Sequence, residues 1–155
     1  MNNLTAERLQ HCLTVGRKMQ IIAKCLPNCP YSPEDMFYLG ILHDIAYEFV
    51  DTQMKHELVG GEILKCNNYK YWKEIYFHGM PDPEYDSLAL DILNYADLTT
   101  DYQGKDVTIA NRLIDIATRY GENSIQYKNA TILSEKLKNK FNALIDESIE
   151  NKKTH

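Results

Sequence analysis

Apolar residues recur at helical spacing through most of the chain, and the stretches between them contain signals that end and begin helices. Pro27 and Pro30 interrupt the first pattern, and residues 32–35 (Ser-Pro-Glu-Asp) form a typical helix start, with a capping serine, an early proline and acids near the positive end of the dipole. The pattern predicts an all-α fold of about six to seven helices. We expect these helices at residues 5–24, 36–49, 54–66, 71–77, 87–98, 107–120 and 124–147.

Two of these segments, 36–49 and 87–98, are apolar nearly all round, which predicts buried helices. Segment 54–66 contains Gly60-Gly61, and a glycine inside a helix costs about 1 kcal/mol relative to alanine. A close approach of another backbone would explain this pair. The 155 residues contain no repeat or linker, so we predict one helical domain over residues 1–150 and a frayed polar tail over 151–155.

Composition and charge narrow the range of functions. The chain is 44% apolar with a formal net charge of −5, and it lacks the Lys/Arg cluster expected of a protein that binds polymeric nucleic acid. The first residues lack the apolar core of a signal peptide, and no apolar run reaches transmembrane length, so we expect a cytoplasmic protein with no membrane partner. The four cysteines are then expected as free thiols, because a zinc clip built on Cys25 and Cys29 has no second pair.

A few polar residues fall where the pattern predicts a core. His43 and Asp44 interrupt one apolar run, Asp97 interrupts another, and His11 lies next to the apolar face of the first segment. A buried carboxylate without a partner costs several kcal/mol, and neither run contains a lysine or arginine. A metal ion would neutralise both acids, and imidazoles would add nitrogen ligands.

The other histidines fit the same interpretation, because His56 opens one predicted helix and His78 closes the next, while His155 lies in the tail. Taken singly, each of these residues is compatible with an ordinary core, surface or capping role. A helical domain whose histidines are incidental therefore stays an alternative. The ordered set predicts a metal site built from His11, His43, Asp44, His56, His78 and Asp97.

The order of these residues resembles the HD superfamily of metal-dependent phosphohydrolases. The local sequence is similar to small bacterial members that look like the symmetrical diadenosine tetraphosphate hydrolases. The resemblance covers residues 5–120 and implies an HD-type helical bundle. It is carried by Arg8-Leu-Gln-His11, Gly40-Ile-Leu-His-Asp-Ile-Ala46, His56-Glu-Leu-Val-Gly-Gly61, Ile75-Tyr-Phe-His78 and Ile92-Leu-Asn-Tyr-Ala-Asp97.

The resemblance implies two divalent transition-metal ions that share one acid, with iron favoured and manganese as the alternative. The first ion would be held by His11, His43, Asp44 and Asp97, and the second by His56 and His78 with Asp44 as the bridge. A hydroxide activated by the ions would attack the phosphorus of a nucleotide or other small phosphorylated metabolite. Asp44 and Arg8 would then be catalytic. A single-metal nucleotidase, which needs only the first four ligands, and a homodimer both stay open.

The sequence departs from this branch in the expected substrate pocket. A lysine that meets substrate phosphate usually follows the second motif, but Tyr47 stands there and brings no charge, and residues 99–105 replace an acidic-proline-glycine turn. These departures leave open a nucleotide-binding or sensor protein on a retained HD scaffold with little turnover. The candidate substrate-binding residues are Arg8, Tyr47 and Lys105, with Arg17, Lys55 and Arg112 as further sources of positive charge. Asp82 could assist the leaving group or orient water, although an ordinary turn residue is the favoured interpretation.

Overall fold

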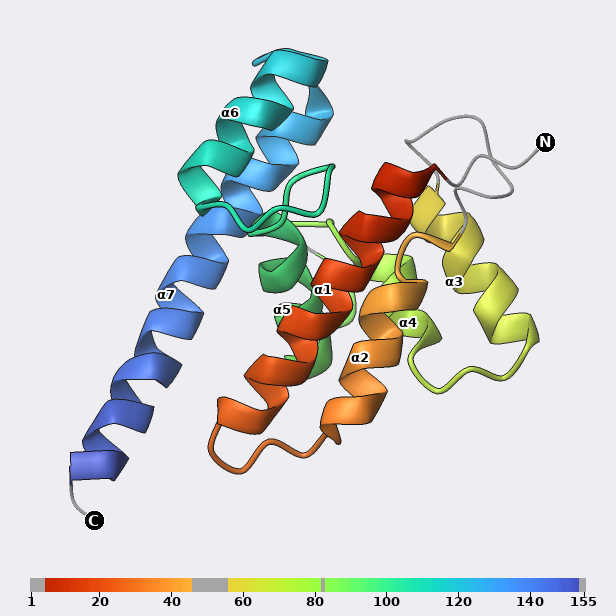
Figure 1. The fold of residues 1–155 in the computed structure, drawn as a ribbon. Coiled ribbons are helices and arrows are strands. Elements are labelled where there is room, and N and C mark those ends of the chain that lie inside the picture. The colour runs from red at the N-terminus through yellow and green to blue at the C-terminus, as the bar shows by residue number, and fades with distance from the viewer. Residues whose placement is uncertain (1–4, 46–55, 82, 154–155) are drawn as a thin grey trace.

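The computed structural model describes residues 5–45, 56–81 and 83–153, with the side chains of 56 and 142–153 outside that description. These residues form seven helices and no strand, apart from an isolated bridge between Thr100 and Asp106. The predicted all-α fold is therefore confirmed (Figure 1). The helices are α1 (Ala6–Cys25), α2 (Pro33–Leu42), α3 (His56–Cys66), α4 (Trp72–Phe77), α5 (Leu88–Leu98), α6 (Ile109–Tyr120) and α7 (Ile125–Lys153). Within the described ranges, no helix combines the length and apolar character that crossing a membrane requires.

Most helices begin at a residue whose hydroxyl accepts the backbone N–H three positions further on. Such a cap satisfies one of the donors that the first helical turn leaves without a partner. The bond is local, so short polar residues in the sequence mark these helix starts closely. The capping residues of α1, α2, α5, α6 and α7 are Thr5, Ser32, Ser87, Thr108 and Ser124.

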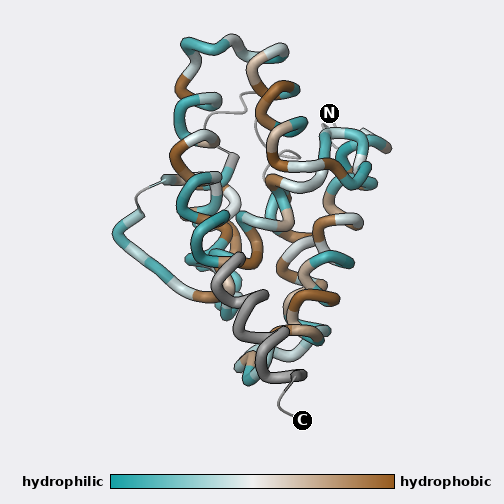
Figure 2. The backbone as a smooth tube through the Cα atoms, turned by 90° about the vertical axis from the view of Figure 1, so that its left-hand side faces the viewer, coloured by the Kyte–Doolittle hydropathy of each residue, from teal (hydrophilic) through white to brown (hydrophobic). Residues whose placement is uncertain are grey.

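The helices pack in pairs around α5. Figure 1 shows α1 beside α2 and α3 beside α4, while α6 lies against the first part of α7. α5 contacts α1, α2, α4 and α7 and is buried along most of its length, as its apolar sequence predicts. The α6 and α7 pair is amphipathic instead: hydrophobic and hydrophilic stretches alternate along it in Figure 2. Fully buried core side chains include Val15, Met19, Met36, Leu39, Ile75, Ile92 and Leu93.

The prediction for α2 was wrong in both extent and burial. The helix ends at Leu42, whereas the prediction extended it to residue 49. Residues 46–49 of the predicted helix lie outside the described part of the chain. The carbonyl of Gly40, which a continuing helix would offer to the N–H four residues on, accepts a hydrogen bond from Nδ1 of His43 at 2.6 Å. Tyr38 is 51% exposed, because α1 and α5 cover only part of the helix surface.

Glycines allow a close contact between α1 and α2. A Cβ atom built on Gly40 would lie 2.4 Å from Cα of Gly16, so an alanine fits at Gly40 only if the helices separate. The contact brings the end of α2 against α1, and with it His43 against His11. The reason predicted for the glycine pair in α3 holds at Gly61, where a Cβ would lie 2.7 Å from Cα of Tyr76 in α4.

The last helix is longer than predicted. α7 continues past 147 to Lys153 and so includes residues 151–153 of the predicted tail. Residues 142–153 contain neither glycine nor proline, so the sequence has no strong signal that would end the helix earlier. An ion pair of 2.6 Å between Lys140 and Asp91 connects α7 to α5.

Candidate metal centre

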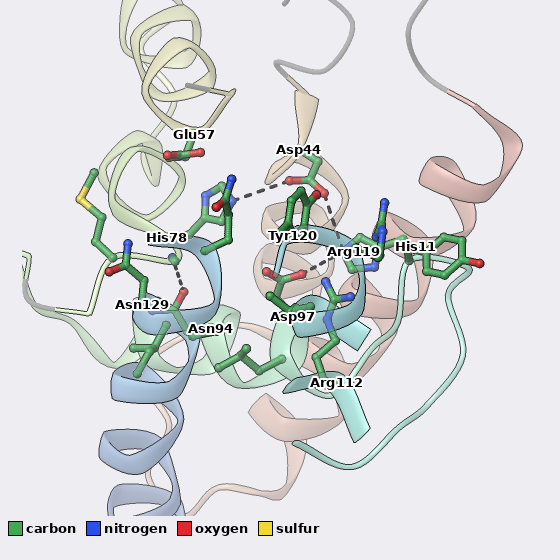
Figure 3. Close-up of a pocket in the computed structure, with 18 of the residues that line it drawn as sticks. His11, Asp44, Glu57, His78, Asn94, Asp97, Arg112, Arg119, Tyr120 and Asn129 are labelled. Atoms are coloured by element: carbon green, nitrogen blue, oxygen red, sulfur yellow. Dashed lines mark hydrogen bonds and ion pairs between the residues drawn. The ribbon is translucent and has the colours of Figure 1, made fainter. Parts of the chain in front are cut away.

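Three imidazoles and two carboxylates from four segments of the chain meet at one end of the bundle (Figure 3). Nε2 of His11, from α1, lies 2.9 Å from Oδ1 of Asp97 in α5 and 3.7 Å from Oδ2 of Asp44. Nε2 of His43, at the end of α2, lies 3.2 Å from the same oxygen of Asp44 and 3.5 Å from Oδ1 of Asp97. His78, after α4, places Nε2 3.7 Å from Oδ1 of Asp44.

The other nitrogen of each imidazole bonds to the backbone. Nδ1 of His11 lies 2.8 Å from the carbonyl oxygen of Asp101, and Nδ1 of His43 and of His78 each lie 2.6 Å from a carbonyl oxygen, that of Gly40 and of Ile75 respectively. A carbonyl oxygen only accepts, so each Nδ1 must carry a proton and donate it. The three Nε2 atoms then face the carboxylates. Histidines that bind metals commonly donate the opposite ring N–H in this way.

The facing atoms need a positive charge between them. A neutral imidazole with its proton on Nδ1 presents a lone pair at Nε2, which would oppose the lone pairs of the carboxylate oxygens. Additional protons on the imidazoles would relieve this, but Nε2 of His43 is buried and has no hydrogen-bond partner among the described residues. An N–H at that position would lie 3.2 Å from Oδ2 of Asp44 and 3.5 Å from Oδ1 of Asp97, close enough for charge attraction but without the alignment of a hydrogen bond. A divalent cation bound by nitrogen and oxygen ligands is the other way to supply that charge, and the donor atoms present are of the types that such an ion accepts.

Burial and the acids give the site a strongly negative potential. Burial lowers the pKa of His43, but Asp44 and Asp97 outweigh this effect and hold that pKa well above its ordinary value. Burial raises the pKa of Asp97, whose side chain is 24% exposed, but the imidazole of His11, 2.9 Å away, and that of His43, 3.5 Å away, bring this pKa well below its ordinary value. Asp97 is therefore ionised at neutral pH, as a carboxylate ligand must be.

Part of this cluster is compact enough for one ion. His11, His43 and Asp44 each offer a ligand atom, and these atoms all lie within 4.8 Å of one another. The two oxygens of Asp44 face different imidazoles: Oδ2 faces His11 and His43, whereas Oδ1 faces His78. This is the arrangement that a carboxylate bridging two ions would have. The side chain of His56 lies outside the description, so a second ion stays a prediction.

The structure places only some of the predicted substrate-binding residues at the cluster. Nη1 of Arg8 lies 3.5 Å from Oδ2 of Asp44, and both residues line the same pocket. Lys105 and Arg17 are exposed, and neither lines this pocket. Lys105 follows a loop that turns back on itself, because Oδ1 of Asp101 accepts the backbone N–H of Gln103 and of Lys105. Tyr47, Lys55 and Asp82 lie outside the described residues.

The pocket has a volume of about 310 Å³, within the usual range for small ligands. One wall is the histidine and carboxylate cluster, and another comes from α6 and the start of α7 (Figure 3). Of this second wall, sequence reasoning proposed only Arg112. The spacing of Arg112 and Arg119, two helical turns apart on an amphipathic helix, was the available signal for the rest. The lining that it missed includes Glu57, Asn94, Tyr102, Arg119, Tyr120 and Asn129.

Asn94 supports the cluster from below. Its side chain is buried in α5, and its Oδ1 accepts the backbone N–H of Gly79 at 2.9 Å. Gly79 follows His78 directly and has a φ of +82°, which favours glycine. The bond thus fixes the turn that aims His78 at Asp44.

Comparisons of the chain with models of known families, with curated proteins and with solved structures found no match. Membership of the HD superfamily therefore stays a prediction from the five motifs.

Proposed function

We propose that this protein is a metal-dependent phosphohydrolase that acts on a nucleotide or other small phosphorylated metabolite. One observation carries the proposal: the Nε2 atoms of His11, His43 and His78 face two carboxylates, while their Nδ1 protons are bound to backbone carbonyls. A bound divalent ion would supply a Lewis acid for phosphate and a means of ionising water near neutral pH.

The residues around the cluster suit a small anionic substrate. Arg8 lies beside Asp44 at the pocket, and an arginine can bind two oxygens of one phosphate. Arg112 and Arg119 line the same pocket, so its local charge differs from the net charge of −5 for the whole chain. In the reaction, the oxygen of water would bond to phosphorus and release a proton, the bond from phosphorus to the leaving oxygen would break, and the leaving oxygen would take up the proton that the water released.

The test is hydrolysis by the purified protein, loaded with Mn²⁺ or Fe²⁺, of a panel of nucleotides and simple phosphoesters. We expect turnover that a chelator removes and that His43→Ala lowers by at least about 100-fold, because His43 is fully buried among the proposed ligands. His155→Ala is the matched control and should retain wild-type rates. Equal rates for wild type and His43→Ala would contradict the proposal.

The same samples separate the alternatives. Metal content and anomalous scattering count the ions, and His78→Ala should lose about half of the metal and most of the activity if two ions share Asp44. A single-metal enzyme would keep its metal and much of its activity in that variant. Nucleotide binding by calorimetry without turnover would favour a sensor. No bound metal, together with a melting temperature that chelation leaves unchanged, would favour a structural helical domain.

A further inference from the structure

The wall of the pocket opposite the acids contains two arginines from one helix. Arg112 and Arg119 lie two turns apart on α6, about 10 Å along the helix axis, and both line the pocket that contains Asp44 and Asp97. Figure 3 shows Arg112 extending from α6 toward the side of the pocket where Asp97 lies. These arginines are separate from Arg8, which comes from α1 and contacts Asp44 directly.

Arg112 has one side of its guanidinium occupied and another without a partner. Nη1 lies 3.0 Å from Oδ2 of Asp115, one turn further along α6, and this ion pair orients the group. Nε is buried and has no hydrogen-bond partner among the described residues. A buried N–H without an acceptor costs about 1–3 kcal/mol. The edge formed by Nε and Nη2 is the edge with which a guanidinium binds two oxygens of one phosphate, so an anion there would remove this cost.

Arg119 is held by aromatic rings at the rim of the same pocket. Its guanidinium carbon lies 4.5 Å from the ring centre of Tyr102 and 5.6 Å from that of Tyr120, and both tyrosines line the pocket. Stacking on a ring uses the face of a guanidinium and leaves the N–H groups at its edge available. The rings therefore restrain an exposed arginine without neutralising its charge.

We propose that Arg112 and Arg119 form a second anion-binding subsite, which selects substrates with a chain of at least two phosphates over simple monophosphate esters. One phosphate would face the histidine and carboxylate cluster, and the next would lie against α6. The spacing of two cations along the helix suits an extended polyanion better than a single phosphate. The assignment of the reacting phosphate depends on the proposed function. The binding of an anion by Arg112 and Arg119 does not depend on it.

The probe is inorganic tripolyphosphate, compared with orthophosphate by calorimetry on metal-free protein. We expect wild type to bind tripolyphosphate at least about 10-fold more tightly than orthophosphate. Arg112→Met and Arg119→Met should each weaken tripolyphosphate binding by about 10-fold, as expected for the loss of a charged hydrogen bond. Arg17→Met removes an exposed arginine that does not line the pocket, and it should bind like wild type.

Either of two outcomes would overturn the subsite: no preference of wild type for tripolyphosphate, or a loss of binding in Arg17→Met as large as in the pocket variants. If Arg112→Met fails to fold, Arg119→Met carries the test, because Arg119 is exposed at the rim. Arg112→Lys, which keeps charge but not the fork, should bind less tightly than wild type. The readout needs no turnover, so an inactive protein that prefers tripolyphosphate would contradict the proposed function and leave the subsite standing.

Discussion

The contact between Gly16 and Gly40 yields a prediction whose sign is decided by two opposing effects. Replacing Gly40 with alanine gains about 1 kcal/mol of helix propensity. The added Cβ would however lie 2.4 Å from Cα and 2.5 Å from N of Gly16, and 2.9 Å from the backbone carbon of Val15. These are backbone atoms, so no side chain can rotate away.

Relieving this overlap requires α1 and α2 to separate by about 1 Å, because carbon atoms in contact lie about 3.5–4.0 Å apart. Overpacking of this kind costs about 1–3 kcal/mol, and the rigid contact places Gly40→Ala near the upper end. We expect a net loss of about 2 kcal/mol after the propensity gain, or about 4–8 °C in melting temperature. The separation would also move His43 away from His11, so metal affinity should fall with stability.

The assay is urea unfolding of Gly40→Ala against wild type, with metal titration of both. The propensity term is measured separately at Asn139, an exposed residue within α7, as the difference between Asn139→Gly and Asn139→Ala. If Gly40→Ala is more stable than wild type by that same difference, the helices do not approach at this point and the reasoning fails.

Three further predictions concern single residues. Asn94→Ala should lose about 1–3 kcal/mol in urea unfolding, because it leaves the N–H of Gly79 without its acceptor; a loss below about 0.5 kcal/mol would mean that the bond is absent. In a thiol titration Cys25 and Cys66 should react first and Cys12 last, because burial hides Cys12 and raises its pKa to about 12. Early reaction of all four cysteines would contradict the burial of Cys12 in the core. Burial raises the pKa of Glu74 by more than the hydrogen bond from Tyr85 lowers it. The folded state therefore holds the proton of the Glu74 carboxyl group more tightly than the unfolded state does. This stabilising contribution is present at low pH and is lost as pH rises through the pKa of the folded state, so Glu74→Gln should gain stability relative to wild type as pH rises above the ordinary pKa of 4.5, and a constant difference would refute the shift.

Local chemistry explains which parts of the fold could be predicted. Helix starts follow from caps such as Ser32 and Ser87, whose bonds reach only three residues along the chain. The end of α2 depends instead on a bond from the His43 ring to the carbonyl of Gly40, which no periodicity reveals. The length of α7 is a question of missing signals, because its last part contains no residue that ends a helix.

The candidate site divides in the same way. The positions of Asp44 and Asp97 inside apolar runs predicted that both acids would lie at one site, because a buried carboxylate needs a partner of opposite charge. In the structure both acids lie beside His11. The arginine wall depends on tertiary contacts: Arg119 lies over Tyr102, which is far from it in sequence and comes from a loop. The same loop folds around Asp101 and leaves Lys105 exposed, so proximity in sequence to Asp97 was misleading for that lysine.

That loop also connects the two walls of the pocket. The carbonyl of Asp101 accepts the Nδ1 proton of His11, so the loop holds the imidazole wall, while the loop continues into α6 with its arginines. Thr14 and Lys18 of α1 bond to the backbone carbonyls of Gly104 and Thr99, which attaches the loop to the helix that carries His11. We therefore expect a change in the loop to act on both walls, since the segment that accepts the His11 proton leads directly to Thr108, which caps α6. This coupling explains how α6, which buries only Ile109 and Ile116, can still present its arginines in a defined position relative to the acids.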